Sequence, residues 1–243
     1  MPTMDFEAYI PSNAPAAERQ AALAAILANE DAAGVEYAVI MPNPVPNPDN
    51  RALAETLRGE RRAIFCCQVN PNHGAEAFTD IEVSVTQLGA KVLKIMPALY
   101  HLNLTGPLGH KLMSKARELD IVVNIHSGGD LSHPLKIGAL CRHYPEVPVI
   151  MDHMGYREWA HDAIVAAQDN PNIYLGTTIA AFEPEFVVRA IEAVGPERVI
   201  YGSNLPVCYS DLAVEALRRQ KLGKDVEDLL LGNNLARLLG MDG

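Results

Sequence analysis

The sequence predicts an α/β fold, a single (β/α)8 TIM barrel with an extra C-terminal helix. Eight short apolar runs rich in β-branched residues recur along the chain, and their ends are 25 to 32 residues apart. Each interval accommodates one strand, one helix and two loops. Because 243 residues hold eight such units, we expect residues 1–243 to form one barrel domain. The alternative fold is a doubly wound open sheet. We do not favour it, because no predicted strand is followed by a Gly-x-Gly-x-x-Gly motif.

The eight predicted strands are apolar along most of their length. This is typical of parallel strands that are covered on both faces. Their residue ranges are 5–10, 36–41, 63–69, 91–96, 121–126, 148–153, 173–178 and 198–203.

Helical patterns lie between the strands. The clearest covers residues 16–33, which are rich in Ala and Leu and end at Gly34, a good C-terminal signal. Further predicted helices span 108–119, 133–143, 156–168, 184–194 and 211–220. The extra helix, 226–239, is amphipathic, and we expect its leucines to pack on the barrel.

Composition describes an acidic globular chain. Apolar residues make up 49% of it, and its net charge is −10. The acidic balance argues against nucleic acid as a partner, and no apolar run reaches the roughly 18 residues of a membrane span. The four cysteines form no Cys-x-x-Cys motif, so we expect no zinc knuckle, no disulfide framework and a cytoplasmic location. The sequence leaves open whether the chain forms a homo-oligomer.

Two histidines, His126 and His153, stand at the ends of neighbouring predicted strands. In a parallel barrel the C-terminal strand ends build the active site. Imidazoles placed there can bind a divalent metal or transfer protons near neutral pH. Asp152 is one position out of phase with His153, so strand alternation predicts that it faces the helix layer.

Three further candidates, Glu7, Tyr9 and Lys94, belong to the first and fourth strands. Glu7 and Tyr9 are two residues apart and so face one side of the first strand, either the barrel interior or the outside. An inward Glu7 would serve as a ligand, a base or an orienting group. Lys94 interrupts an apolar strand, where it would hold the carboxylate of a substrate or pair with Glu7.

Five segments in strand order carry a family resemblance. They are Val-Asn-Ile-His-Ser-Gly at 123–128, Pro-Val-Ile-Met-Asp-His-Met-Gly at 148–155, Asn-Ile-Tyr-Leu-Gly-Thr at 172–177, Glu-Arg-Val-Ile-Tyr-Gly-Ser-Asn-Leu-Pro at 197–206 and Gly-Asn-Asn-Leu-Ala-Arg-Leu-Leu-Gly at 232–240. From about residue 5 to the C-terminus the chain resembles the amidohydrolase-2 branch of the amidohydrolase superfamily, which includes aminocarboxymuconate-semialdehyde decarboxylase and several lactonases. The resemblance implies an amidohydrolase-like barrel over residues 1–243, and it names no substrate.

In that family a first-strand His-x-His pair, a fifth-strand histidine and an eighth-strand aspartate hold a divalent metal, and a sixth-strand histidine assists catalysis. His126 and His153 match the fifth-strand and sixth-strand positions. Glu7 and Tyr9 replace the His-x-His pair, and Asn204 replaces the aspartate. An amide cannot accept a proton as a carboxylate does, and a phenol with a pKa of about 10 is a poor ligand. We therefore expect no metal cofactor; the alternative keeps zinc or manganese on Glu7, His126 and Asn204.

The resemblance and the altered ligand positions together imply a hydrolase that acts on a small carboxylated lactone or amide without the usual metal. Glu7 or His153 would activate water, while His126, Tyr9 and Asn204 would polarise the carbonyl group. Tyr9 and Lys94 are the predicted substrate-binding residues. One alternative is a catalytically inactive barrel that binds a small ligand or a partner protein. Another is a metal-dependent hydrolase or decarboxylase with an altered ligand set.

Overall fold

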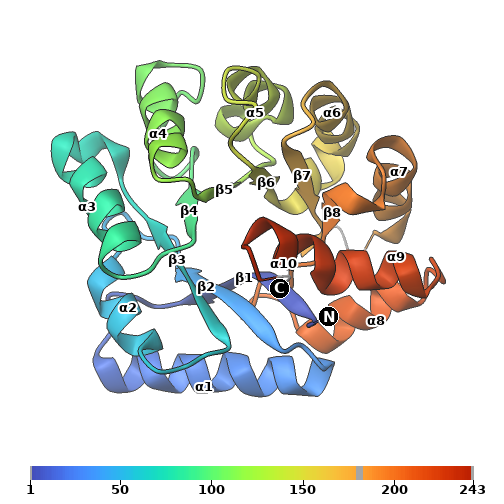
Figure 1. The fold of residues 1–243 in the computed structure, drawn as a ribbon, viewed down its shortest axis with the longest axis horizontal. Helices are drawn as coiled ribbons and strands as arrows, with labels where there is room; N and C mark the ends of the chain where they lie inside the picture. Colours follow the sequence, from blue (N-terminus) through green and yellow to red (C-terminus); the bar gives the residue numbers. More distant parts are fainter. Residues whose placement is uncertain (1, 179–182, 242–243) are drawn as a thin grey trace.

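The computed structural model describes residues 2–178 and 183–241. Its eight strands are parallel and pair in the order of the sequence, β1 to β8, inside a ring of helices (Figure 1). The predicted TIM barrel is therefore confirmed. The strands are β1 (Met4–Ile10), β2 (Tyr37–Pro42), β3 (Ala63–Gln68), β4 (Val92–Ile95), β5 (Val122–Ile125), β6 (Val149–Met151), β7 (Ile173–Gly176) and β8 (Val199–Ile200).

Backbone hydrogen bonds between β1 and the segment that follows β8 close the barrel. The amide of Phe6 donates to the carbonyl of Tyr201 at 3.2 Å, and the amide of Tyr9 donates to the carbonyl of Leu205 at 2.8 Å. Both acceptors lie beyond the short β8, which ends at Ile200, so the segment that follows β8 continues along β1. The polar residues after β8 are thereby held beside those of β1.

Most of the ring consists of helices at the predicted positions. The first helix and the one before β8 have the predicted bounds, and the first ends at Gly34, whose φ of 73° places it in the left-handed region that glycine tolerates. Two helices between β2 and β4 were not predicted. The helices are α1 (Ala16–Ala33), α2 (Asn50–Leu57), α3 (Ala75–Thr86), α4 (Pro107–Glu118), α5 (Pro134–Cys141), α6 (Tyr156–Asp169), α7 (Pro184–Val194) and α8 (Ser210–Arg218).

The extra C-terminal helix is present as three consecutive pieces: α9 (Lys224–Asp228), the π-helical turn η6 (Leu229–Asn233) and α10 (Asn234–Leu238). Leu235 and Ala236 of α10 pack with Met4, where β1 begins. This segment therefore covers the N-terminal end of the barrel and leaves the opposite end as the mouth. Among the helices of residues 2–178 and 183–241, none combines the length and hydropathy that crossing a membrane requires.

Alternate strand residues build two apolar layers. On β2, Ala38 and Ile40 pack between the strands and the helices, whereas Val39 and Met41 belong to the barrel interior. Because both faces are covered, the strands are apolar along most of their length, as the sequence showed. The opposite, C-terminal ends of the strands form the mouth, where these apolar layers end.

Candidate active site

Glu7 reaches the mouth because β1 is irregular. The pairing of β1 with β2 shifts register between Asp5 and Ala8, and such a bulge changes the direction in which side chains point. Glu7 is fully buried, and the hydroxyl of Tyr9 donates a hydrogen bond to its Oε1 at 2.5 Å. Within the described residues, Glu7 Oε2 has no hydrogen-bond partner. One carboxyl oxygen is thus fixed and the other is available for chemistry.

Lys94 projects from β4 into the same interior. Its Nζ donates to Asn124 Oδ1 at 2.7 Å, forms an ion pair with Asp152 and lies 3.5 Å from Glu7 Oε1. The lysine is only 1% exposed. Burial alone would lower the pKa of Lys94, but Asp152 and Glu7 raise it above its usual value, so the side chain stays an ammonium.

Asp152 faces the mouth, and the prediction that it faces the helix layer is wrong. β6 ends at Met151, and His153 has φ 56° and ψ 0°. Strand alternation stops at this left-handed turn, so Asp152 and His153 both point inward. Asp152 Oδ1 accepts a hydrogen bond from the amide of Ser127 at 2.8 Å. Burial opposes its ionisation, but the ammonium of Lys94 keeps the pKa of Asp152 below its usual value.

Thr178 fixes the position of His153 through two contacts. Thr178 Oγ1 accepts the backbone amide of His153 at 3.0 Å and lies 2.6 Å from its Nδ1. The other ring nitrogen, Nε2, lies 3.8 Å from Glu7 Oε1 and 3.7 Å from Asp152 Oδ2. Burial lowers the pKa of His153 to about 3, so the imidazole is neutral at physiological pH.

His126 and Tyr156 complete the cluster. The rings of His126 and His153 have centroids 5.0 Å apart, and the ring of Tyr156 stacks on His153 at 4.6 Å. His126 Nε2 lies 3.4 Å from the hydroxyl of Tyr156. Gly128 makes room for this ring, because a Cβ there would lie 1.8 Å from a ring carbon of Tyr156. Burial also lowers the pKa of His126, so both imidazoles are neutral.

Asn204 lies beside Glu7 because the two backbones are hydrogen-bonded. Its amide donates to the carbonyl of Glu7 at 3.0 Å, and its φ of 65° is a left-handed conformation that asparagine adopts more readily than most residues. Its side chain is mostly buried. The six predicted site residues thus lie at one mouth: Glu7, Tyr9, Lys94 and His153 around the buried charges, His126 against His153, and Asn204 next to Glu7.

A protein-family model described as Amidohydrolase matches residues 6–241. The chain belongs to this family. A comparison with curated protein sequences finds no match.

Several solved structures share the fold of this chain. An uncharacterized TIM-barrel protein from Bordetella bronchiseptica has a TM-score of 0.83 and 17% identity, with 100% of both chains covered. A candidate 2-pyrone-4,6-dicarboxylic acid hydrolase from Pseudomonas putida has a TM-score of 0.74 and 17% identity over 100% of this chain and 98% of that one. The 5-carboxyvanillate decarboxylase of Novosphingobium aromaticivorans, solved with manganese and a nitrobenzoic acid, has a TM-score of 0.76 and 15% identity over 98% and 96% of the chains.

One structural neighbour was thus solved with a divalent metal, and the mouth of this chain also holds groups of the kind that bind metals. Glu7, Asp152 and His153 place ligand-type atoms within 4.8 Å of one another. This differs from the expected set of Glu7, His126 and Asn204. The ammonium of Lys94, however, already lies against both carboxyl groups. A divalent cation at the same oxygens would be repelled by that charge, so the residues do not fit a metal while Lys94 is protonated.

Four site residues received no role in the sequence analysis: Asp152, Asn124, Thr178 and Tyr156. Asn124 and Thr178 occupy predicted strands, so their position at the mouth could be read from the sequence. Asp152 could not, because its direction depends on the turn at His153. Tyr156 falls at the start of a predicted helix, and only the approach of its ring past Gly128 brings it into the site.

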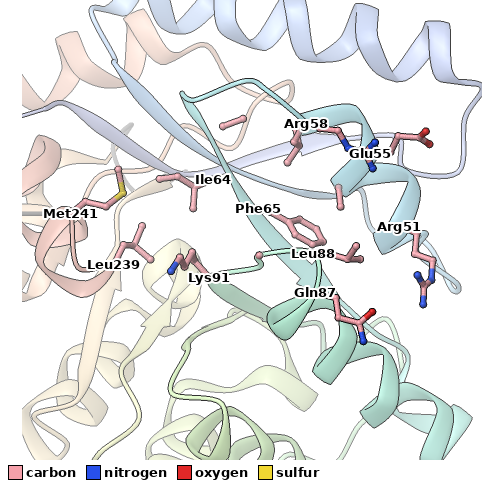
Figure 2. A pocket seen from close by; sticks show the side chains of 14 residues that line it. Arg51, Glu55, Arg58, Ile64, Phe65, Gln87, Leu88, Lys91, Leu239 and Met241 are labelled. Carbon is pink, nitrogen blue, oxygen red and sulfur yellow. The ribbon is translucent and has the colours of Figure 1, made fainter.

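A separate cavity of about 410 Å³ opens at the other end of the barrel (Figure 2). Its floor includes Ile64 and Phe65 at the start of β3, and Leu239 follows α10. Arg58 and Lys91 are exposed beside it. No residue of the mouth lines this cavity, so it is not part of the candidate active site.

Proposed function

We propose that this amidohydrolase hydrolyses a small carboxylated lactone without a metal. The observation that carries the proposal is the carboxyl group of Glu7, which has one oxygen held by Tyr9 and the other without a partner in the described residues. Glu7 is fully buried beside two neutral histidines. A small carboxylated amide is the related substrate class.

Glu7 acts as the general base. Burial raises its pKa to about 8, although Lys94 opposes this by favouring the carboxylate. A base whose pKa is near the working pH can take a proton from water and return it later. Neutral His153 is a weaker base because its pKa is about 3, and its Nε2 faces the two carboxyl groups. Its role is to orient Glu7.

His126 and Asn204 polarise the carbonyl group. His126 is neutral, and its Nδ1 has no hydrogen-bond partner among the residues that the structure describes. A neutral imidazole N–H and a carboxamide N–H can both stabilise the negative charge that develops on a carbonyl oxygen during acyl transfer. Tyr9 is engaged with Glu7, so it contributes mainly by holding that carboxylate.

The reaction is balanced by one proton that moves twice. Water oxygen attacks the carbonyl carbon of the lactone while Glu7 takes a water proton. The tetrahedral intermediate then breaks its bond to the ring oxygen, and Glu7 returns the proton to that oxygen. The product is an open-chain acid carrying a hydroxyl group or its keto tautomer.

The carboxylated substrate class is supported by the structural neighbours. The candidate hydrolase from Pseudomonas putida is named for a pyrone dicarboxylic acid, and the Novosphingobium decarboxylase was solved with a nitrobenzoic acid. Lys94 stays the predicted partner of the substrate carboxylate. Since its Nζ already contacts Asn124 and Asp152, this role requires the ammonium to reach substrate across those partners.

A panel of small carboxylated lactones, with 2-pyrone-4,6-dicarboxylate as the first member, tests the proposal in buffer containing a chelator. Loss of ring absorbance with acid release is the expected signal. Glu7→Gln should lower turnover about 100-fold or more, whereas Glu18→Gln, a change on the exposed face of α1, should leave it unchanged. Full turnover in both Glu7→Gln and His153→Ala would overturn the assignment.

A decarboxylase is the second candidate, because the Novosphingobium neighbour carries out that chemistry on the same fold. The same assays distinguish the two reactions: hydrolysis consumes one water and retains every carbon, whereas decarboxylation releases carbon dioxide. Absence of turnover with lactones, amides and carboxylated aromatics would instead favour a barrel that binds without catalysis.

A further inference from the structure

Lys94 supplies a positive charge at the centre of the mouth. Its Nζ contacts Asp152 from the end of β6 and Asn124 on β5, and it lies 3.5 Å from Glu7 Oε1 on β1. An ammonium has three protons, and these three side chains offer three acceptors. The ammonium therefore has two hydrogen bonds and one ion-pair contact, to protein atoms that come from three other parts of the barrel.

The same acceptors are suitable ligands for a divalent cation. Oxygen atoms of Glu7 and Asp152 and a ring nitrogen of His153 lie within 4.8 Å of one another. Two carboxylates and an imidazole are a frequent donor combination for zinc and manganese. Glu7 Oε2 is buried and has no partner within residues 2–178 and 183–241, so the cluster has ligand capacity that Lys94 does not use.

We propose that the Lys94 ammonium is the resident cation of this barrel, that it excludes a divalent ion, and that its removal creates a metal site on Glu7, Asp152 and His153. The inference follows from charge and contacts and does not depend on the lactone chemistry. A fixed positive charge a few ångströms from a second cation in a buried site opposes binding strongly, because little water is present to screen the two charges. Removing Lys94 also leaves Asp152 without its counter-ion, which a metal would then replace.

Metal titration of the full chain tests the proposal. Chelator-treated protein is titrated with Mn²⁺, followed by the electron paramagnetic resonance signal of free manganese, and with Zn²⁺, followed by elemental analysis after gel filtration. Lys94→Ala is expected to bind one ion per chain at least about a hundredfold more tightly than the parent protein. Lys94→Gln, whose amide can still donate to Asp152 and Asn124, is expected to behave in the same direction.

Two control variants locate the effect. Lys91→Ala removes an exposed lysine immediately before the same strand and should leave metal binding at the parent level. Lys94→Ala combined with Asp152→Asn removes one ligand and should lose most of the affinity gained. These controls separate a site at the mouth from a general loss of positive charge.

The outcomes decide the proposal in either direction. Stoichiometric binding of Mn²⁺ or Zn²⁺ by the parent protein as tightly as by Lys94→Ala would overturn it. So would folded Lys94→Ala and Lys94→Gln proteins that bind no more tightly than the parent. If neither variant folds in chelator, refolding in Zn²⁺ decides: recovery of cooperative thermal unfolding supports the proposal, and failure to recover overturns it.

Discussion

The hydroxyl of Tyr9 donates to Glu7 Oε1, and the two side chains come from positions two apart on one strand. This contact favours the carboxylate form of Glu7, while burial favours the acid form, and burial prevails. Glu7 is therefore an acid at neutral pH that becomes a base near pH 8. The balance between burial and this hydrogen bond helps to set the pKa of Glu7, and with it the pH dependence that we expect for hydrolysis.

The rate of hydrolysis should depend on pH through Glu7. Because the pKa of Glu7 is raised to about 8, the basic form is the minor one at pH 7 and dominates above pH 8. We expect kcat/KM to rise about tenfold per pH unit below pH 8 and then to level off. Initial rates across the pH range would measure this; a flat profile would contradict a role for Glu7 as base.

Tyr9→Phe should move that profile to higher pH. The substitution removes a hydrogen bond to the ionised form of Glu7, and such a bond contributes about 1.5–3 kcal/mol, or roughly one to two pKa units. We expect slower turnover at pH 7 and recovery at alkaline pH, with the plateau retained. An unchanged midpoint with a uniformly lower rate would show that Tyr9 acts on the substrate instead.

Thr178→Val should destabilise the fold and disturb His153. The methyl group fills the volume of the hydroxyl but accepts no hydrogen bond, so the amide and Nδ1 of His153 lose their shared partner. Leaving buried polar groups without partners costs about 1–3 kcal/mol of unfolding free energy. Urea denaturation measures the loss. Thr178→Ser, which keeps the oxygen, is the matched control and should lose much less.

We expect the fold to become less stable at alkaline pH because Glu30 keeps its proton in the folded state and loses it on unfolding. Burial, together with neighbouring Asp5, raises its pKa in the folded protein from 4.5 to about 10. Between those values the folded state keeps a proton that the unfolded chain releases, so the free energy of unfolding falls as pH rises, by up to about 1.4 kcal/mol per pH unit. Above pH 8 the contribution of Glu7 is already complete, whereas Glu30 continues to act up to about pH 10.

Thermal unfolding of Glu30→Gln between pH 8 and pH 10 isolates this effect. The neutral amide has no proton to lose, so the decline in Tm with pH should be shallower than in the parent protein. Glu18→Gln on the exposed side of the same helix should keep the parent slope. Equal slopes in all three proteins would mean that Glu30 ionises normally.

The barrel could be predicted because its signals are local. The apolar runs mark every strand, and Gly34 marks the end of α1, since both depend on neighbouring residues only. The strands are shorter than predicted where polar residues such as Asp152 begin the loops. α2 and α3 were not predicted.

The site was only partly predictable because side-chain direction depends on backbone irregularities. The bulge in β1 and the left-handed turn at His153 decide where Glu7 and Asp152 point, and neither leaves a sequence pattern. His126 and His153 were found because they closely follow regular apolar strands. The partnership of Lys94 with Asp152 joins residues 58 positions apart, and it required the folded barrel.

β1 contacts the segment that follows β8. This seam therefore joins a strand that is synthesised before the other seven to a segment that is synthesised after them. The amide of Ser203 donates to Asp5 Oδ1 across 198 positions of sequence, and Asn204 meets Glu7 at the same seam. Contacts between such distant residues carry the largest chain-closure entropy and tend to form late. We expect the edge of β1 to stay open to solvent and to other chains until the last strand has left the ribosome. The residues that complete the mouth then cover this edge, and the protein becomes less prone to aggregate.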